Sequence, residues 1–589
     1  MQKPLEFYTN QKLHFEKELM LLKKKLAMSS VLRLVVFLSA VLSTYFLFDN
    51  IKIVIPIAAF WVILFLYLLF RHFKLQTKSN LNKALLEINN TELKVLNRDY
   101  FLLNEGNEFI NPAHTFSYDI DLFGKGSFFQ YCNRTVTNEG RQEFVELLLN
   151  NDISNIKEKQ RAINELSQHP KWRQQFSALA SLVKVEHPAE EIADWIQNYK
   201  TVFSKFIGFF PKVFSVISLV LVTLLSLQII PEQLLLIWFL FGVGISGAFL
   251  KKVSKLYGEA SKAKDTFKQY HKLLNEIESI SFTSKILKQK QQEIQTETQK
   301  ASLIFAKFSK VLDSFDQRNN LIIAIIGNGF FLRDLQQVNK VENWIHNYKD
   351  KVENWFQVIA FFDAQNSLAN FTFNHPSYVF PQINTSKGII FSKNLGHPLL
   401  HKSQRIDNDF RIQNKQFFIV TGANMAGKST FLRTVSLAIV MGNIGLPVCA
   451  DEFEYAPIKL ITSMRTSDSL ADNESYFFSE LKRLKFIVDQ IKNEEDFIIL
   501  DEIVKGTNST DKASGSKKYV EKLGNSKSTG IIATHDLSLC KIENDLSAVK
   551  NYFFDAEIIN DELYFDYKLK DGICKNMNAS FLLKKMKII

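Results

Sequence analysis

The run Gly422-Ala-Asn-Met-Ala-Gly-Lys-Ser429 decides the fold of the C-terminal part of this chain. An apolar segment, Phe417–Thr421, precedes it, and a helical pattern over Thr430–Val440 follows. The spacing matches GxxxxGK[ST] in the strand–loop–helix context that a phosphate-binding loop requires. Backbone N–H groups of such a loop and of the next helix N-terminus surround phosphate oxygens. The motif therefore predicts a nucleotide site formed by Gly422, Ala423, Asn424, Met425, Ala426, Gly427, Lys428, Ser429 and Thr430.

Two residues of this loop and two carboxylates downstream have individual roles in such a site. Lys428 is expected to bring a positive charge to the β- and γ-phosphates, and Ser429 is expected to coordinate Mg²⁺. The apolar run Phe497–Leu500 ends in Asp501 and Glu502. An acidic residue at such a strand end holds the Mg²⁺ shell, which suits Asp501, and Glu502 is placed to orient or deprotonate the attacking water. ATP and Mg²⁺ are therefore the expected cofactors.

A third apolar run, Gly530–Ala533, leads into His535. Ligands bind at the carboxyl ends of the strands in open α/β sheets, so we expect His535 to sense the γ-phosphate and to act with Lys428 and Glu502 in catalysis. From about residue 386 onward, short β-like runs alternate with helical segments. This alternation predicts an α/β P-loop domain with a parallel sheet over residues 386–589.

The composition is that of an ordinary folded protein with a basic balance. Of the 589 residues, 46% are hydrophobic and 23% are charged, which excludes a disordered or collagen-like chain. The net charge of +11 permits binding to nucleic acid or to an anionic membrane surface. The four cysteines form no CxxC and no Cys/His cluster, which argues against a structural zinc site and against a disulfide framework.

Four long apolar runs, arranged as two close pairs, interrupt this polar chain. Each comprises 17 or 18 residues: Val31–Phe48, Ile53–Phe70, Val213–Ile230 and Leu234–Leu250. About 20 apolar residues are needed to cross a hydrocarbon core of about 30 Å. Arg33, which lies near one end, is the only charge inside the four runs. The pattern favours two transmembrane hairpins, over residues 31–70 and 213–250, above buried helical hairpins in a soluble protein.

Charges at the flanks predict the topology of these hairpins. Lys23–Lys25 precede the first hairpin, and Lys251 and Lys252 follow the second, whereas the two connecting loops carry almost no positive charge. By the positive-inside rule, both hairpins enter from and return to the cytoplasm. We therefore expect a multi-pass protein of the cytoplasmic membrane, with segments 1–30 and 75–210 and the C-terminal α/β domain in the cytoplasm.

The C-terminal motifs resemble the ATPase domain of the MutS mismatch-repair family, within the wider ABC-type ATPases. The resemblance rests on Thr421–Thr430 with its Asn-Met pair, on Leu500–Asp511 and on Ala533–His535. It implies an enzyme that hydrolyses ATP and forms a homodimer through these domains. In that family a signature serine reaches the ATP of the partner, and the resemblance implies this role for Ser475. It also implies that Asp511 faces the dimer interface.

Segments upstream of the ATPase motifs are similar to the helical core of the same family. They are Asn133–Gly140, Ile156–Leu166 and Trp355–Pro381. The resemblance implies a helical core in two parts, 75–210 and 251–385, with the second hairpin between them. MutS proteins carry the arms that embrace DNA at roughly this place. The mismatch-reading domain of the family has no counterpart in the first 120 residues, so we expect DNA binding mostly through phosphates, without direct mismatch reading.

The segment after the second hairpin is predicted to be helical throughout. Residues 253–320 are rich in Lys, Gln and Glu, with apolar residues at helical spacing, and predict long amphipathic helices. Residues 321–375 continue this helical pattern. The basic faces suit either DNA phosphates or an anionic lipid surface, and the sequence leaves both open.

Two alternative functions belong to other classes. An ABC-type half-transporter also places transmembrane helices before a C-terminal ATPase, and an ATP-dependent membrane scaffold would bind ATP without using DNA. The transporter is disfavoured because the chain has four apolar runs instead of six and lacks a Leu-Ser-Gly-Gly-Gln signature. The sequence therefore predicts a membrane-anchored MutS-like ATPase with four transmembrane helices in contact with lipid.

Overall fold

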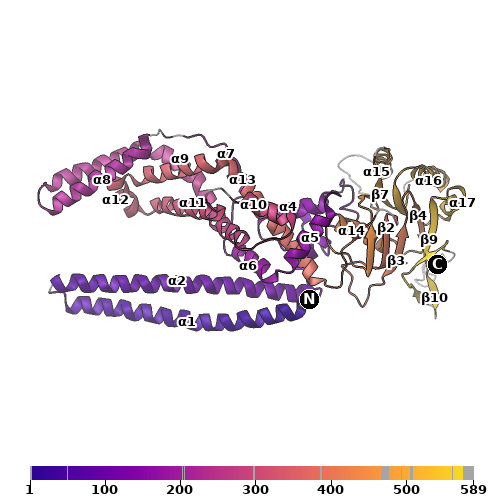
Figure 1. Cartoon of the computed structure of the whole chain (residues 1–589), viewed down its shortest axis with the longest axis horizontal. Helices are drawn as coiled ribbons and strands as arrows, with labels where there is room; N and C mark the ends of the chain where they lie inside the picture. Colours follow the sequence, from indigo (N-terminus) through magenta and orange to yellow (C-terminus); the bar gives the residue numbers. More distant parts are fainter. Residues whose placement is uncertain are drawn as a thin grey trace.

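The computed structural model describes residues 3–49, 51–201, 203, 206–295, 299–384, 388–465, 476–492, 494–504, 509–559 and 562–574. The molecule is elongated, with a helical region at one end and an α/β domain at the other (Figure 1). The predicted order of a helical region followed by a mixed α/β domain is confirmed.

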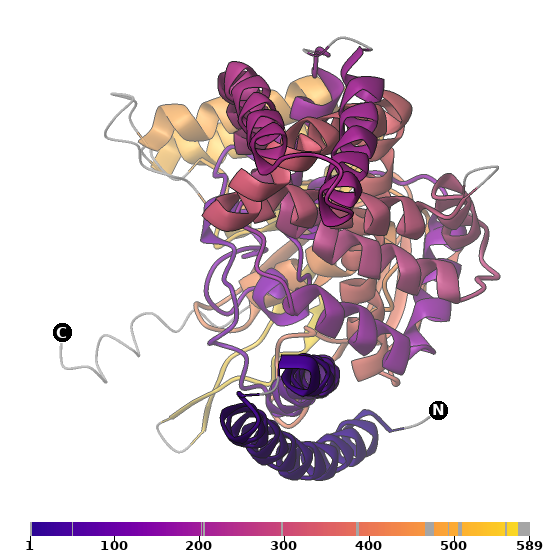
Figure 2. The same cartoon turned by 90° about the vertical axis from the view of Figure 1, so that its left-hand side faces the viewer.

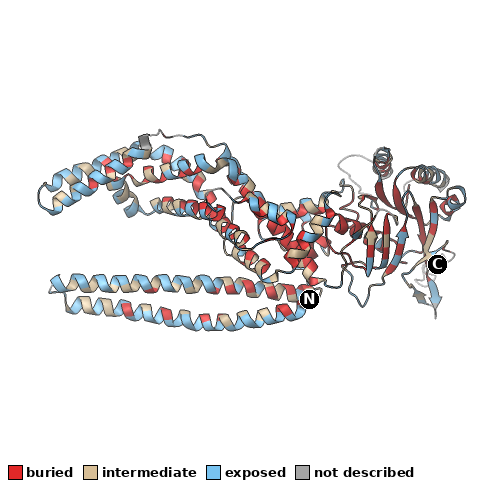
Figure 3. Ribbon diagram, viewed as in Figure 1, coloured by how far each residue is buried: buried red, intermediate tan, exposed pale blue. Residues whose placement is uncertain are grey.

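Two long antiparallel helices, α1 (Pro4–Phe46) and α2 (Ile51–Leu96), form hairpin 1. The polar base of this hairpin packs on the helical region, where the Tyr8 hydroxyl donates to Asn374 Oδ1 at 2.8 Å. The Arg134 guanidinium binds the buried Glu92 carboxylate at the same base. The apolar runs lie toward the opposite end of the hairpin, and Figure 3 shows that most of their side chains are exposed or only partly buried.

Eleven further helices make up the rest of the described helical region. They are α3 (Phe128–Cys132), α4 (Asn138–Leu149), α5 (Ile156–Ser167), α6 (Pro170–Ser181), α7 (Ala189–Gln197), α8 (Phe206–Ser226), α9 (Glu232–Ser279), α10 (Lys285–Glu293), α11 (Ala301–Asp316), α12 (Leu321–Phe331) and α13 (Arg333–Asn374). Helices α8 and α9 form hairpin 2. Viewed from the end in Figure 2, hairpins 1 and 2 lie on opposite sides of the helical region.

Helix α13 is the central element of this region. It is 42 residues long and contacts α4, α5, α7, α9 and α11. Aromatic side chains fill the space around it: Trp355 on α13 packs against Phe305 on α11, and Phe356 packs against Tyr270 on α9. Because α13 leads directly into the α/β domain, it is the main covalent connection between hairpin 2 and that domain.

Asp363 joins α13 to the start of α4. Its Oδ2 atom accepts hydrogen bonds from the N–H groups of Val136 (3.0 Å) and Thr137 (2.8 Å) and from the Thr137 hydroxyl (2.7 Å). A Cβ on Gly140 would lie 2.3 Å from the same oxygen, so the approach of the two helices requires glycine there. The carboxyl is fully buried, and burial raises the pKa of Asp363 to about 6.

The segment 321–375 is helical, as predicted, but it is not one continuous helix. The segment forms two helices, α12 and α13, that meet at an angle of 86°. The break lies at Leu332, which has a left-handed backbone conformation with φ 45°. No proline or glycine occupies this position, so the residue types that usually cause a helix to bend are absent there.

The α/β domain contains a six-stranded sheet in the order β12-β9-β4-β8-β7-β6. Strands β4, β6, β7, β8 and β9 are parallel to one another, and the edge strand β12 is antiparallel to β9. These strands are β4 (Phe417–Gly422), β6 (Lys459–Ser463), β7 (Asp496–Asp501), β8 (Thr529–Ala533), β9 (Val549–Phe554) and β12 (Leu569–Asp571). The three strands predicted from apolar runs are β4, β7 and β8.

The other strands form two smaller sheets, and four α-helices accompany them. A four-stranded sheet has the order β1-β5-β2-β3, and β10 pairs with β11. The strands are β1 (Gln382–Ile383), β2 (Ile390–Leu395), β3 (Asn408–Ile412), β5 (Glu452–Tyr455), β10 (Glu557–Ile559) and β11 (Glu562–Tyr564). The helices are α14 (Lys428–Asn443), α15 (Tyr476–Gln490), α16 (Ser509–Gly524) and α17 (Ile542–Asp545).

The α/β domain shares one hydrophobic core with part of the helical region. Phe129 and Phe144 belong to the same buried cluster as Val435 of α14. Polar contacts reinforce this junction, since the Thr462 hydroxyl donates to Asp119 Oδ2 at 2.6 Å. The start of the helical region is therefore packed on the sheet as well as linked to it through α13.

Candidate nucleotide site

The loop between β4 and α14 has the backbone shape of a phosphate-binding loop. Strand β4 is buried along its whole length and lies between β8 and β9. Gly427 (φ 102°) and Met425 (φ 68°) have positive φ values, which turn the loop back before the helix begins at Lys428. A Cβ on Gly427 would lie 3.0 Å from Tyr567 Cδ1. The N-terminus of α14 thus points its free N–H groups at the loop, as an anion site requires.

Lys428 lies inside this loop with its ammonium group bound to the chain. Its Nζ atom donates to the carbonyl oxygens of Gly422 (2.8 Å) and Ala423 (3.0 Å) and lies 3.3 Å from His535 Nε2. Burial lowers the pKa of Lys428, while the carboxylates of Asp501 and Glu502 act in the opposite direction. The ammonium group of Lys428 must therefore break its hydrogen bonds to these two carbonyl groups before it can bind a phosphate.

The order of the strands brings the carboxylates and the histidine to the loop. Asp501 ends β7, His535 follows β8, and β8 lies directly between β7 and the loop strand β4. The Ser429 hydroxyl donates to Asp501 Oδ2 at 2.7 Å. Glu502 has φ 57°, and its N–H donates to the Ala533 carbonyl at 2.8 Å. This left-handed conformation is unusual for a residue with a side chain, and such residues cluster at functional sites.

His535 lies between the positive and the negative parts of the site. Its Nε2 atom is 3.3 Å from Lys428 Nζ and 3.3 Å from Glu502 Oε1. Burial and the charge of Lys428 lower the pKa of His535, and the charges of Glu502 and Asp501 raise it. The net shift of the His535 pKa is downward, which favours the neutral ring. Depending on the tautomer, Nε2 accepts from Lys428 or donates to Glu502.

Residues 418–586 match the family model described as MutS domain V. This domain is an ATPase domain. The DNA mismatch repair protein MutS of Clostridium botulinum (strain Okra / Type B1) is 30% identical over 243 residues, which cover 40% of this chain and 26% of that protein. MutS of Clostridium novyi (strain NT) is 32% identical over 232 residues, 38% of this chain and 25% of that protein. The chain thus spans about a quarter of the length of these relatives.

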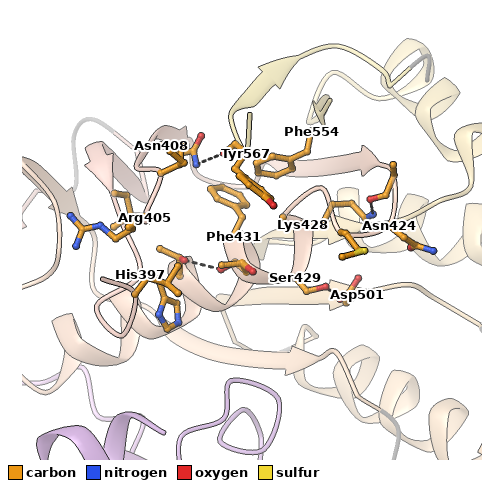
Figure 4. Close-up of a pocket in the computed structure, with 18 of the residues that line it drawn as sticks. His397, Arg405, Asn408, Asn424, Lys428, Ser429, Phe431, Asp501, Phe554 and Tyr567 are labelled. Carbon is orange, nitrogen blue, oxygen red and sulfur yellow. Dashed lines mark hydrogen bonds between the residues drawn. The ribbon is translucent and has the colours of Figure 1, made fainter. Parts of the chain in front are cut away.

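A cavity of about 650 Å³ extends from the loop of domain V toward β2 and β3. Figure 4 shows Phe431, Phe554 and Tyr567 grouped beside the loop, with His397 and Arg405 farther along the same cavity. The Asn408 amide donates to the Tyr567 carbonyl at 3.0 Å, which ties the segment before β12 to β3. The volume and the aromatic lining suit a nucleoside attached to the phosphates held by the loop.

Sequence reasoning missed this nucleoside end of the cavity. His397 and Asn408 belong to the β2–β3 region, and Tyr567 precedes β12, so none of them lies near the motifs in the chain. Their spacing carries no signal, because only the folded sheets bring these segments beside the loop. Burial and the nearby Arg433 lower the pKa of His397 to about 4, so this side chain is neutral at pH 7.

The described part of the chain does not test two residues assigned by family resemblance. Ser475 lies outside the described residues. The backbone of Asp511 lies in α16, while its side chain is outside the described part. Of the predicted loop residues, Ala423, Asn424, Met425, Gly427, Lys428, Ser429 and Thr430 line the cavity, while Gly422 ends β4 and Ala426 is buried beneath the loop.

Proposed function

We propose that this chain is a membrane-anchored MutS-type ATPase that works as a homodimer and converts its ATP cycle into movement of the helical region. One observation carries the membrane part of this proposal. Hairpin 1 and hairpin 2 extend toward the same end of the molecule, and the ATPase domain lies at the other end (Figure 1). Because the apolar parts of hairpins 1 and 2 lie at the same end of the molecule, both can insert into one bilayer.

The exposure and the polar contacts of the hairpins support the same placement. Four described helices are long and apolar enough to span a membrane, and at most 17% of each most apolar window is buried. In hairpin 1, Trp61 Nε1 donates to Ser43 Oγ at 2.9 Å, and in hairpin 2, Trp238 Nε1 donates to Ser218 Oγ at 2.7 Å. Each bond satisfies polar groups between the two helices of a hairpin, as a hydrocarbon environment requires.

The site residues have defined tasks in the proposed hydrolysis. Lys428 leaves the loop carbonyl groups and binds the β- and γ-phosphates. Ser429 and Asp501 place two oxygen atoms 2.7 Å apart, a donor set that suits Mg²⁺, which neutralises phosphate charge when bound. Glu502 accepts a proton from the attacking water. The neutral His535, beside Glu502, contacts the γ-phosphate.

The proposed dimer completes each site from the other subunit. In this proposal Ser475 reaches the ATP of the partner, and Asp511 lies at the interface, as the family resemblance implies. Separation of the ATPase domains after hydrolysis then moves α13, whose first residue follows α12 next to hairpin 2. DNA contacts, where they are made, involve phosphates, since the region that carries the DNA-embracing arms in MutS is occupied here by hairpin 2.

Reconstitution of the full chain into liposomes tests the proposal. We expect the protein to resist extraction at high pH and to hydrolyse ATP, and we expect Lys428→Ala to lose hydrolysis while it stays in the membrane. Recovery of the intact protein in the soluble fraction without detergent would reject the membrane anchor. Equal hydrolysis by Lys428→Ala and the wild type would reject the assigned site. Adding duplex DNA to the same assay shows whether DNA alters turnover.

A further inference from the structure

Helix α12 presents an apolar surface that the sequence pattern did not single out. Its sequence, Leu-Ile-Ile-Ala-Ile-Ile-Gly-Asn-Gly-Phe-Phe, contains one polar side chain. Leu321 and Ile322 are 72% and 69% exposed, and Ile325 and Ile326 are 45% and 49% exposed. A contiguous exposed patch of large aliphatic side chains marks an interaction surface more often than a solvated one.

The position of α12 beside α9 shows what covers this patch. At its start, Arg318 and Asn319 contact Ser254 and Tyr257, which lie in the polar part of α9. At its end, Gly329 approaches Gly242 so closely that a Cβ on Gly242 would lie 2.2 Å from the Gly329 carbonyl oxygen. Gly242 lies in the middle of the apolar run of α9. Helix α12 therefore runs from the polar flank of hairpin 2 into its apolar part.

The length of α12 excludes a complete crossing. Its 11 residues rise about 16 Å, roughly half of a hydrocarbon core of about 30 Å. The sharp turn at Leu332 then directs the chain into α13, which returns to the helical region. The charged side chains at the two ends stay together, because Arg318 Nε lies 3.3 Å from Asp334 Oδ2. The chain before and after α12, at Arg318 and Asp334, therefore lies on the same side of a membrane into which α12 inserts.

Several polar groups at the two ends of α12 are paired within the protein. Asn320 Oδ1 accepts from the N–H groups of Ile322 and Ile323 at the first turn. Asn328 Oδ1, on the one polar side chain within the helix, accepts from the N–H of Asp334 at 2.9 Å. The Gln336 amide donates to the Phe331 carbonyl at 2.8 Å. In lipid, no water is present to bind an unpaired backbone group, so this pairing suits a membrane-embedded helix end.

We infer that α12 is a re-entrant membrane segment that buries its exposed face among the acyl chains of the cytoplasmic leaflet. The inference rests on the proposed membrane insertion of hairpin 2 and adds a fifth embedded segment. In this arrangement the N-terminal end of α13 is attached to a membrane-embedded helix, and α13 itself connects that helix to the ATPase domain. The occupant of the patch is lipid, because the patch continues the apolar surface of α8 and α9.

Depth-dependent quenching of single fluorescent labels tests this inference. The four native cysteines are buried, so a thiol-reactive environment-sensitive dye labels introduced cysteines in the folded chain. The test site is Ile325→Cys on α12. Leu219→Cys in hairpin 2 is the membrane control, and Leu303→Cys on α11 is the aqueous control, with 57% and 53% of the native side chains exposed. Liposomes contain lipids with a spin label at a shallow or a deep acyl position.

The outcomes separate the inference from the proposal on which it rests. We expect the label at 325 to be quenched several-fold more strongly than the label at 303, and more by the shallow than by the deep spin label. A label at 219 that is quenched while 325 behaves like 303 would overturn the re-entrant segment and leave the anchor intact. Absence of quenching at both 219 and 325 would reject membrane insertion, and the re-entrant segment with it.

Discussion

The Ser429 hydroxyl donates a 2.7 Å hydrogen bond to Asp501 Oδ2, although 72 residues separate the two in the chain. Ser429 lies in the first turn of α14 and Asp501 at the end of β7, so the strand order of the sheet produces this contact. Two oxygen atoms of a prospective Mg²⁺ shell are therefore held together by the fold itself.

Replacing Asp501 by Asn should remove most of the Mg²⁺ dependence of ATP binding. The amide keeps a partner for Ser429 but loses the negative charge that a hard cation requires. We expect wild-type affinity for ATP to rise with Mg²⁺ at least about tenfold, and the variant to show little change, with titrations in the presence and absence of Mg²⁺ as the measurement. Asp545→Asn, on the distant α17, should behave like the wild type. A variant that keeps the full Mg²⁺ response would assign the metal to other groups.

Replacing Glu502 by Gln should allow ATP to bind but should stop its turnover. The amide cannot accept a proton from water, and loss of a general base lowers the rate by about 10²–10⁴-fold. Single-turnover hydrolysis and nucleotide binding, measured on the same preparation, separate the two effects. Glu494→Gln, near the opposite end of β7, is the matched control. Hydrolysis at the wild-type rate by Glu502→Gln would show that another group activates water.

The buried pair at the base of hairpin 1 should contribute far more to stability than a surface pair. Glu92 is nearly fully buried and Arg134 is largely buried, and Glu92 also accepts from the Asn374 amide at 2.8 Å. Glu92→Gln leaves the guanidinium uncompensated and should cost about 3–5 kcal/mol. Glu452→Gln breaks the exposed pair with Lys393, which water and salt screen, and should cause a much smaller loss of stability. Chemical unfolding in detergent measures the stability of both variants. Equal losses of stability would contradict the conclusion that the Glu92–Arg134 pair contributes more than a surface pair.

The burial of Asp363 predicts a pH dependence of stability. Its pKa is about 6 in the folded chain, above the ordinary value of 3.8, so the folded state binds the proton more tightly than the unfolded state does. The contribution of Asp363 to the free energy of unfolding therefore falls by up to about 3 kcal/mol as the pH rises from about 4 to about 7. Asp363→Asn does not titrate and should lack this component. Unfolding at pH 4.5 and 7.0 compares the two proteins, and identical pH dependence would refute the raised pKa.

Binding to duplex DNA should be weak, sensitive to salt and indifferent to a mispair. Contacts between Lys or Arg and phosphate weaken steeply with salt and carry little sequence information. Preference for a mispair needs contacts to base edges or to a deformable step. Competition between matched and single-mismatch duplexes at two salt concentrations measures both properties. A strong preference for the mismatch that survives high salt would reveal a recognition surface elsewhere in the chain.

The part of the site nearest the phosphates could be predicted because each element carries its own signal. Strands β4, β7 and β8 are apolar runs, and each one leads into residues that we propose to act in hydrolysis: the glycine-rich loop, Asp501 with Glu502, and His535. Parallel pairing then brings the three strand ends together without further information. The spacing of the loop around Lys428 is specific enough to identify phosphate binding from the chain alone.

The nucleoside end of the site and the shape of the helical region could not be predicted in this way. Asn408 and Tyr567 meet across 159 residues, and only the pairing of separate sheets decides that contact. Helix α12 is shorter than a membrane span, so a length criterion excludes it. The turn at Leu332 could not be predicted because leucine itself disfavours a positive φ. The hydrogen bond from the Asp334 N–H to Asn328 Oδ1 spans this turn and forms only with the folded backbone.

The continuous length of α13 has a consequence for control of the enzyme. A rod of 42 residues is about 63 Å long, so a rotation of about 5° at the ATPase end displaces the other end by about 5 Å. If ATP binding shifts α12 within the leaflet, thermodynamic reciprocity requires the lateral pressure and thickness of the bilayer to change the affinity for ATP in turn. The enzyme would then report the mechanical state of its membrane through the occupancy of its nucleotide site.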